Sequence, residues 1–290
     1  MPGQPLAHCE TNDQLINLWC HGKSPETSEA YRRDLSYFLA FVGNKPLWEV
    51  TLNDVQEFSD ALSLKNYALA TIRRRLSAVK SILSFGHKIG VLPVNVGFPL
   101  IVPKPKDKLA ERILSESQVL TMIAMEPNPR NQALLRFLYA TGMRVEELCQ
   151  LRWRDLQPGS AGGGQVTIYG KGGLTRTVVF SKETWEQVKA LRGDAGWDEP
   201  VFRSRVRSRD GSHHLSDTQV LRIVRTAAER VGIDLKVSPH WLRHCHGTHA
   251  ADRGVPLHLI QQTLGHASLT TTSRYLHARP KDSSAMHLAV

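Results

Sequence analysis

The sequence predicts a mainly α-helical protein of the α+β class, with a helical first domain and a mostly helical second domain that holds a small antiparallel β-sheet. Its 290 residues exceed the usual size of one domain, so two hydrophobic cores are expected. The first hundred residues contain amphipathic segments separated by glycine and proline. Further along, two β-prone runs, residues 165–169 and 175–180, flank a Gly-Lys-Gly-Gly turn.

Four helices are predicted in the first domain from their start and stop signals. Thr27 is a candidate N-cap, Gly43 suits the left-handed residue that follows a helix, and Thr51 with Asp54 resembles a capping box. The expected helices begin after Thr11, run from about Thr27 to Val42, begin after Thr51, and run from about Ala68 to Phe85 ahead of Gly86.

The fourth of these helices separates apolar from basic side chains. Ile72, Leu76, Val79 and Leu83 recur at spacings of three and four, which places them on one face. The basic side chains largely on the other face are Arg73, Arg74 and Lys80. This basic face is either a solvated surface or a contact for the phosphates of a nucleic acid, and the helix alone leaves both interpretations open.

A stretch rich in proline and lysine, residues 99–111, is typical of an extended linker. We place the first domain at residues 1–101, a linker that carries Lys104 and Lys106 at residues 102–111, and the second domain at residues 112–290. The helix signals of the second domain are Ser115 with Gln118, a helix from about Arg130 to Thr141-Gly142, Ser216 with Gln219, and Ser238-Pro239.

Charge is distributed unevenly along the chain. The net charge is +10, which favours a polyanionic partner. Residues 1–100 carry 10 basic and 9 acidic side chains, whereas residues 201–290 carry 13 and 6. Arg203, Arg205, Arg207 and Arg209 alternate, so an extended segment would place them on one side, either as a disordered basic loop or as a contact for phosphates.

The composition also indicates a cellular compartment. No apolar run is long enough to span a bilayer, and residues 1–10 lack the layout of a signal peptide. The four cysteines form no CxxC pair, which fits free thiols in a reducing environment. We therefore expect a cytoplasmic protein that does not associate with membranes.

Four short motifs in the second domain carry the functional signal. They are TGMRVEEL at residues 141–148, GKG at 170–172, HWLRH at 240–244, and LGH at 264–266 followed nine residues later by Tyr275. Each is weak alone, since the first could merely end a helix with Arg144 paired to Glu147 as a structural ion pair. In this order, and ahead of Tyr275, they resemble the tyrosine recombinase (phage integrase) family, and the length and two-domain layout resemble its Xer-type members.

The resemblance implies a fold, an activity and a set of site residues. It makes residues 1–101 a helical DNA core-binding domain and residues 112–290 a catalytic domain that cleaves and rejoins DNA through a 3′-phosphotyrosyl intermediate. The catalytic residues that it implies are Arg144, Lys171, His240, Arg243, His266 and the nucleophile Tyr275, with Glu147 in a supporting position. The Cys245-His246-Gly247 segment departs from the small or apolar residues that usually follow HxLRH in the family.

The chemistry of phosphodiester cleavage requires these residue types. Guanidinium groups stay charged and bind two phosphate oxygens at once, so Arg144 and Arg243 suit the negative charge that develops during attack. The phenol of Tyr275 has an ordinary pKa of about 10, so it must lose its proton during attack or have that pKa lowered by nearby cations. The resemblance assigns protonation of the leaving 5′ oxygen to Lys171, while His240 and His266 would donate hydrogen bonds or move a proton.

Several structural alternatives remain open at this point. His240 could merely cap a helix, His266 could be a core histidine, and Tyr275 could be an ordinary helix residue. The histidines near His240 also suggest a metal site, but HWLRH lacks the Glu of zinc peptidase motifs, so no metal and no other cofactor is expected. Residues 162–164, three glycines without a following Lys-Ser/Thr, are interpreted as a flexible approach to the hairpin.

Two other functions compete with recombination. A type IB topoisomerase uses similar chemistry to relax DNA, and a DNA-binding regulator could keep the fold without activity. The compact size disfavours the first, and competent side chains at all six reacting positions disfavour the second. The resemblance further implies double-stranded DNA as partner and a homo-oligomer on DNA, a tetramer in the synaptic complex.

Overall fold

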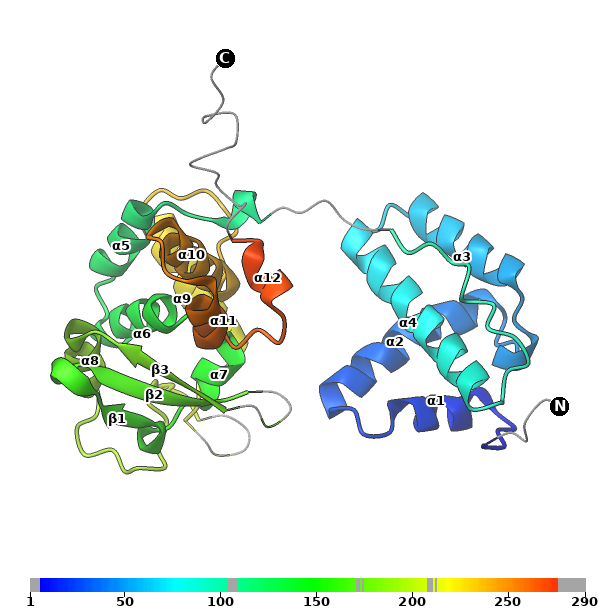
Figure 1. The fold of residues 1–290 in the computed structure, drawn as a ribbon, viewed down its shortest axis with the longest axis horizontal. Coiled ribbons are helices and arrows are strands. Elements are labelled where there is room, and N and C mark those ends of the chain that lie inside the picture. The colour runs from blue at the N-terminus through cyan, green and yellow to red at the C-terminus, as the bar shows by residue number, and fades with distance from the viewer. Residues whose placement is uncertain are drawn as a thin grey trace, which may run out of the picture. The chain divides into compact units, whose positions relative to one another are not determined.

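The structure is a computed structural model that describes residues 6–103, 109–170, 173, 175–207, 211 and 213–275. The chain divides into two compact units, Met1–Asp107 and Lys108–Val290, which are drawn from blue to cyan and from green to red in Figure 1. Helices dominate both units, and the described strands form one small antiparallel sheet. The predicted fold class is confirmed.

In the described part of the first unit, four α-helices and a 3-10 turn surround one core. Helix α4 packs against the other three α-helices. Its Leu76 and Val79 are fully buried, as is Leu35 of α2. The elements are α1 (Asn12–Cys20), α2 (Pro25–Phe41), η1 (Leu47–Glu49), α3 (Leu52–Leu64) and α4 (Leu69–Lys88).

Two predicted helix boundaries in this unit are wrong. Helix α2 begins earlier than expected because Ser24 is the N-cap, and the backbone N–H of Thr27 donates to the Ser24 hydroxyl. Helix α4 continues past Gly86 to Lys88. Gly86 is buried in the helix, where an added Cβ would clash with the Leu92 side chain, so this glycine permits close packing and does not end the helix.

In the second unit, most of the predicted helix boundaries agree with the structure. Both predicted capping boxes form, and Gly142 ends α6 in the left-handed conformation with φ 59°. The elements are η2 (Ala110–Arg112), α5 (Glu116–Ala124), α6 (Pro129–Thr141), α7 (Val145–Gln150), η3 (Trp153–Asp155), β1 (Leu156–Pro158), η4 (Ser160–Gly162), β2 (Gly164–Tyr169), β3 (Thr175–Phe180), α8 (Lys182–Lys189), α9 (Asp217–Arg230), α10 (Pro239–Asp252), α11 (Leu257–Leu264) and α12 (Leu269–Ser273).

The sheet has the order β1-β2-β3, with both pairs antiparallel. Strands β2 and β3 form the predicted hairpin, whereas β1 was not predicted because only three residues pair. The glycines at residues 162–164 are not a flexible approach: Gly162 belongs to η4 and Gly164 is the first residue of β2. An added Cβ at Gly164 would lie 2.5 Å from the Phe180 ring, so the hairpin requires glycine there.

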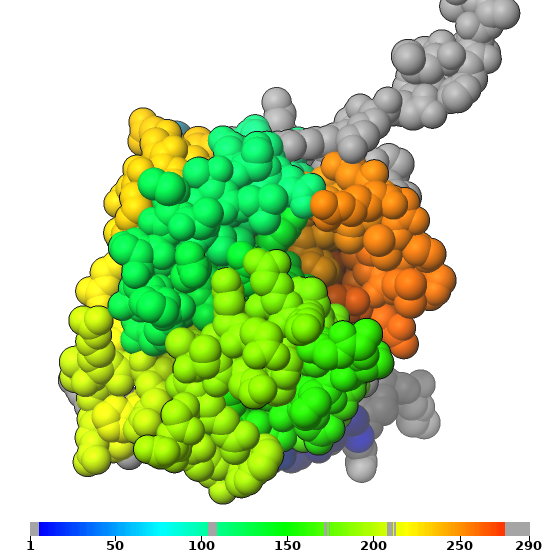
Figure 2. Space-filling model, turned by 90° about the vertical axis from the view of Figure 1, so that its left-hand side faces the viewer, coloured from blue at the N-terminus to red at the C-terminus, as the bar shows by residue number. Residues whose placement is uncertain are grey.

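Helix α10 crosses the interior of this unit and contacts α5, α6, α9 and α11. Figure 2 shows α11, coloured orange, beside the green surface of the sheet, and α11 also contacts β3 and α12. The elements that carry the sequence motifs are therefore neighbours in space. Within the described ranges, no helix is long and apolar enough to cross a membrane, and no disulfide joins any of the four cysteines.

Candidate active site

Three of the four motifs converge on the buried arginine of α10. Arg243 is 3% exposed, and its two terminal nitrogens donate to the carbonyl oxygens of Gly142 (2.7 Å) and Leu264 (2.6 Å). Burial, and then the charge of Arg144, lowers the pKa of Arg243 to about 10, so the side chain remains a cation at neutral pH. One guanidinium group thus joins the TGMR, HWLRH and LGH segments.

Arg144 lies beside this junction as the residue before α7. Its Nη2 donates to the carbonyl of Gly265 (3.4 Å), and its Nη1 donates to Glu147 Oε1 (3.0 Å). The side chain remains 41% exposed. The predicted structural ion pair with Glu147 therefore exists, yet much of the Arg144 guanidinium still faces solvent, where a phosphate can reach it.

Glu147 is held by a second arginine that the sequence analysis did not identify. Arg176, in β3, donates to both carboxylate oxygens of Glu147, at 2.9 and 2.7 Å, and to the carbonyl of Thr263. Burial opposes ionisation of Glu147, but the hydrogen bonds from Arg176 and Arg144 prevail and lower its pKa. The carboxylate thus fixes Arg144 relative to the hairpin.

Tyr275 follows α12 and is 4% exposed. Its ring stacks on the ring of His266, with centroids 6.0 Å apart and planes at 20°. It also lies against the α10 backbone, because an added Cβ at Gly247 would be 2.7 Å from Tyr275 Cε2. Gly247, three residues after HxLRH, therefore makes room for the tyrosine ring.

The tyrosine and its neighbouring histidines are held in neutral forms. Burial raises the pKa of Tyr275, although Arg243, Arg274 and Arg144 act in the opposite direction. Burial, and then Arg243, lowers the pKa of His266 to about 4. Its Nδ1 lies 2.9 Å from the Thr272 hydroxyl, which fixes the ring. The cluster is electrostatically positive without carrying protonated imidazoles.

The structure gives fewer contacts for the other two predicted catalytic residues, His240 and Lys171. His240 is the second residue of α10, and its ring packs edge to face on His244 with centroids 4.3 Å apart. Burial of part of the ring, and then Arg243, lowers the pKa of His240. Lys171 lies outside the described residues, between β2 and β3.

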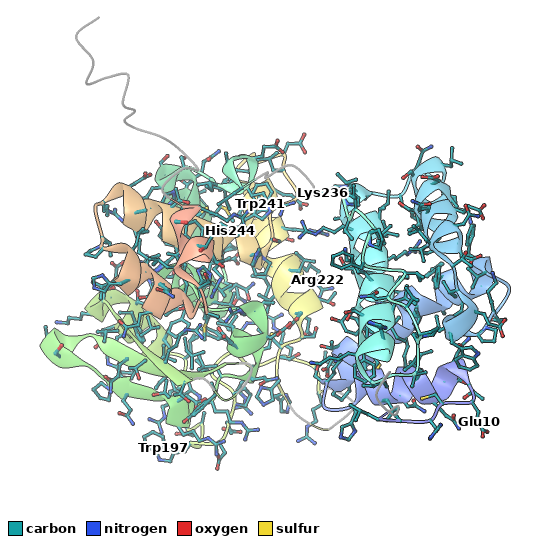
Figure 3. The ribbon with its side chains drawn as sticks, turned by 45° about the vertical axis from the view of Figure 1, so that its right-hand side comes forward. Glu10, Trp197, Arg222, Lys236, Trp241 and His244 are labelled. Carbon is teal, nitrogen blue, oxygen red and sulfur yellow. The ribbon has the colours of Figure 1, made fainter. Side chains whose placement is uncertain are left out.

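Sequence reasoning missed His244, whose Nδ1 lies 3.2 Å from the Tyr275 hydroxyl. The second His of HWLRH was the available signal, but its partner is 31 residues away. Figure 3 labels His244 and Trp241 on α10. The remaining members of this histidine group have structural partners: His249 bonds Tyr139 and the Leu114 carbonyl, and His246 bonds the Tyr139 carbonyl. Among the described side chains, no three His, Cys, Asp or Glu residues are grouped to hold a metal ion.

The predicted DNA-contacting side chains have varied surroundings. In α4, Arg73 is exposed, Arg74 pairs with the buried Asp34 at 2.8 Å, and Lys80 donates to the carbonyls of Phe98 and Leu100. Lys80 thus has a structural role, because it holds the segment that follows α4 against this helix. Lys104, Lys106 and Arg209 lie outside the described residues.

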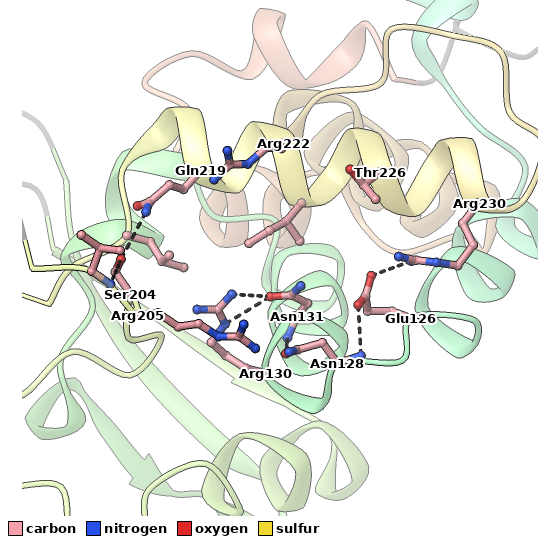
Figure 4. Close-up of a pocket in the computed structure, with 13 residues that line it drawn as sticks. Glu126, Asn128, Arg130, Asn131, Ser204, Arg205, Gln219, Arg222, Thr226 and Arg230 are labelled. Atoms are coloured by element: carbon pink, nitrogen blue, oxygen red, sulfur yellow. Dashed lines mark hydrogen bonds and ion pairs between the residues drawn. The ribbon is translucent and has the colours of Figure 1, made fainter.

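The arginines at 203–207 lie near a cleft of about 450 Å³ between α6 and α9. Figure 4 shows Arg222 and Arg230 along α9, with Arg130 and Arg205 facing them. Arg230 pairs with Glu126 at 2.7 Å and Arg203 with Glu199 at 3.2 Å. In the part of the chain that the structure describes, Arg205 and Arg222 have no carboxylate partner, and Arg207 is exposed.

Comparison with known proteins identifies the family. The phage integrase family model matches residues 112–282, and the model for the phage integrase N-terminal SAM-like domain matches residues 15–88. A tyrosine recombinase XerC from Xylella fastidiosa (strain M23) is 31% identical over 265 residues, 88% of this chain and 87% of that protein. A tyrosine recombinase XerD from Vibrio cholerae is 30% identical over 94% of this chain and 93% of its own length.

Solved structures share the fold. A lambda integrase dimer bound to a core site superposes with a TM-score of 0.72 at 17% identity, over 93% of this chain and 95% of that one. XerH bound to its difH substrate gives a TM-score of 0.69 at 21% identity, over 97% and 84%. The chain therefore belongs to the phage integrase family of tyrosine recombinases. The predicted function class, site-specific recombination, is confirmed at this level, and neither a topoisomerase nor an inactive regulator is favoured.

Proposed function

We propose that this recombinase cleaves and rejoins double-stranded DNA through Tyr275, by way of a covalent 3′-phosphotyrosyl intermediate. The observation that supports this most is the convergence at Arg243, which binds the Gly142 and Leu264 carbonyls while Tyr275 packs nearby against His266. Three sequence-distant motifs thereby lie around one guanidinium group, near the phenol of Tyr275.

The two arginines would bind the scissile phosphate. Arg144 is the more exposed and would meet the non-bridging oxygens first. Arg243 still has donors beyond those bound to carbonyls, because a guanidinium carries five N–H groups. Donors fixed in this way stabilise the charge of the transition state without reorganising, and loss of one typically reduces the rate by about 10²–10³-fold.

The same chemistry accounts for proton transfer and requires no cofactor. Lys171 would protonate the leaving 5′ oxygen, and His240 and His266 would add hydrogen bonds to the phosphate. The phosphotyrosyl bond is itself a phosphodiester, so a second 5′ hydroxyl reverses the step without ATP. We propose that neither metal nor nucleotide cofactor takes part.

DNA binding would involve both units. We propose residues 1–101 as the core-binding domain, residues 102–111 as linker and residues 112–290 as the catalytic domain. Phosphate contacts would come from Arg73, Arg74, Lys80, Lys104, Lys106, Arg203, Arg205 and Arg207. Of these, the geometry most favours Arg205, which has no carboxylate partner among the described residues, and least favours Lys80, which bonds two carbonyls.

Assembly and location are proposed by analogy with relatives. One structural neighbour, with a TM-score of 0.72 at 18% identity, is a lambda integrase tetramer bound to a Holliday junction. We propose that this chain likewise forms a homotetramer on two DNA duplexes, and that it acts in the cytoplasm.

Replacing the nucleophile tests the proposal. Tyr275→Phe removes the hydroxyl and keeps the ring that packs on Gly247 and His266. Covalent complexes with a DNA duplex nicked beside the scissile phosphate should therefore disappear from a denaturing gel, while DNA binding stays close to wild type. A covalent adduct formed by the Phe variant, or one mapped to another side chain, would exclude Tyr275 as the nucleophile.

A further inference from the structure

The histidine that contacts the Tyr275 hydroxyl is not one of the predicted catalytic residues. His244 follows Arg243 on α10 and is partly buried, with its Nδ1 3.2 Å from the phenolic oxygen. The two ring centroids lie 5.9 Å apart. Among the described residues, no other hydrogen-bond partner of this hydroxyl is found.

Both groups of this pair are uncharged at neutral pH. Burial, and then the nearby cations and His240, lowers the pKa of His244 to about 3, so its imidazole is neutral at working pH. Burial raises the pKa of Tyr275, so the phenol keeps its proton. Both groups are therefore neutral, and in the tautomer with its hydrogen on Nε2 the Nδ1 atom accepts a hydrogen bond from the phenol O–H.

The other two histidines are less suited to receive this proton. His266 stacks face to face on the tyrosine ring, and its Nδ1 is occupied by the Thr272 hydroxyl. His240 packs edge to face on His244, and no hydrogen bond between His240 and the phenol is found among the described residues. His244 alone among the three has a nitrogen at hydrogen-bond distance from the reacting oxygen.

We propose that His244 is the general base that accepts the Tyr275 proton during DNA cleavage. This proposal rests on Tyr275 being the nucleophile. As the tyrosine oxygen bonds to phosphorus, its O–H bond breaks and the proton moves to Nδ1. The bond from phosphorus to the 5′ oxygen breaks, and that oxygen takes a proton from a separate acid, Lys171. In rejoining, the imidazolium returns its proton to the departing phenol.

Proton transfer and attack would occur in one step. A free phenolate is disfavoured because the pKa of Tyr275 is raised, and a free imidazolium is disfavoured because the pKa of His244 is lowered. When the phosphate is attacked, however, the phenol becomes far more acidic as its oxygen bonds to phosphorus. The negative charge that gathers on the phosphate oxygens also stabilises an adjacent imidazolium.

The first test separates basicity from hydrogen bonding. In His244→Asn the amide oxygen can take the place of Nδ1 and accept the phenolic hydrogen bond, but it cannot take up a proton. Single-turnover formation of the covalent complex should slow by about 10²-fold or more, with DNA binding unchanged. A rate within about threefold of wild type would overturn the proposal and leave His244 as a positioning residue.

A second test uses chemical rescue and a modified leaving group. His244→Ala should regain at least tenfold in cleavage rate with added imidazole, and no rescue would count against a base at this position. A DNA substrate with sulfur in place of the bridging 5′ oxygen needs no acid, because the thiolate leaves unprotonated. It should restore Lys171→Ala but not His244→Asn, whereas restoration of His244→Asn would make His244 an acid.

A third test needs no substitution and therefore does not depend on a variant folding. Nitrogen-15 NMR of the wild-type protein should show His244 Nδ1 as an unprotonated ring nitrogen. A protonated Nδ1 could not accept the tyrosine proton and would refute the proposal. None of these results depends on Tyr275→Phe, so failure of the base assignment and failure of the proposed nucleophile can be told apart.

Discussion

The carboxylate of Glu147 organises the site although it touches no reacting atom. Its two oxygens receive hydrogen bonds from Arg176 and Arg144, and its side chain is 8% exposed. A buried ion pair adds little net stability, yet removing one partner leaves an uncompensated charge. The value of Glu147 is therefore positional: it keeps the Arg144 guanidinium at the junction of β3, α7 and α11.

Glu147→Gln should destabilise the protein and slow DNA cleavage together. The amide keeps the shape but loses the charge that balances Arg176, which is 10% exposed, so we expect a loss of about 3 kcal/mol in the free energy of unfolding. Urea denaturation measures it. The control is Glu199→Gln, whose partner Arg203 is exposed, and its effect should be under about 1 kcal/mol. Equal losses in both variants would contradict this account.

Sequence motifs located single residues but not the contacts between them. Arg144, Arg243 and Tyr275 could be chosen because each lies in a recognisable motif of the family. Arg176 and His244 were missed because their roles depend on partners 29 and 31 residues away. The hydrogen bonds of Lys80 were likewise not predicted, because its carbonyl partners lie 18 and 20 residues away.

Helix ends were predicted correctly where all the residues that define them lie within one turn of the helix. The capping boxes at Ser115 and Ser216 form because the cap and its N3 partner lie within one turn. Gly86 misled the prediction, since a glycine in a helix can serve either to end it or to admit a neighbour, and the neighbour Leu92 comes from the following loop. The N-cap at Ser24 was missed although Pro25 follows it in the first helical position.

The cleft between α6 and α9 provides a prediction at the scale of elements. Arg205→Ala and Arg222→Ala should each weaken DNA binding similarly on cognate and random duplexes, because phosphate contacts carry no sequence information. Each should also reduce the slope of log affinity against log salt by about 1. Arg154→Ala is the control, since Asp198 already pairs with that arginine. Unchanged slopes would remove both residues from the DNA-binding surface.

At the scale of the whole chain, composition predicted two cores and a basic C-terminal half, because both follow from counting residues. It could not predict how the basic charge is used. Arg176 is paired with Glu147 and Arg230 with Glu126, whereas Arg205 and Arg222 remain without a carboxylate partner in the described residues. Net charge therefore overstates the number of side chains that can meet a phosphate.

The histidine cluster makes the second unit sensitive to acid. Burial lowers the pKa values of four histidines there: His240, His244, His246 and His266. The unfolded chain, with histidine pKa values of about 6.5, then binds more protons than the folded protein, so stability rises with pH. The contribution is complete above about pH 6.5 and is lost as the pH falls, toward about 4 for His266 and about 3 for His244.

We therefore expect the urea midpoint of the full chain to fall steadily between pH 7 and pH 5. Histidines of the unfolded chain take up protons in this interval, whereas the buried histidines of the folded protein stay neutral. Acid therefore stabilises the unfolded state relative to the folded one. His266→Asn removes one of these titrating groups but keeps a polar side chain beside the Thr272 hydroxyl. The urea midpoint of this variant should therefore depend less on pH than that of wild type. A wild-type midpoint that stays constant from pH 7 to pH 5 would show that these imidazoles ionise in the folded protein as readily as in the unfolded chain.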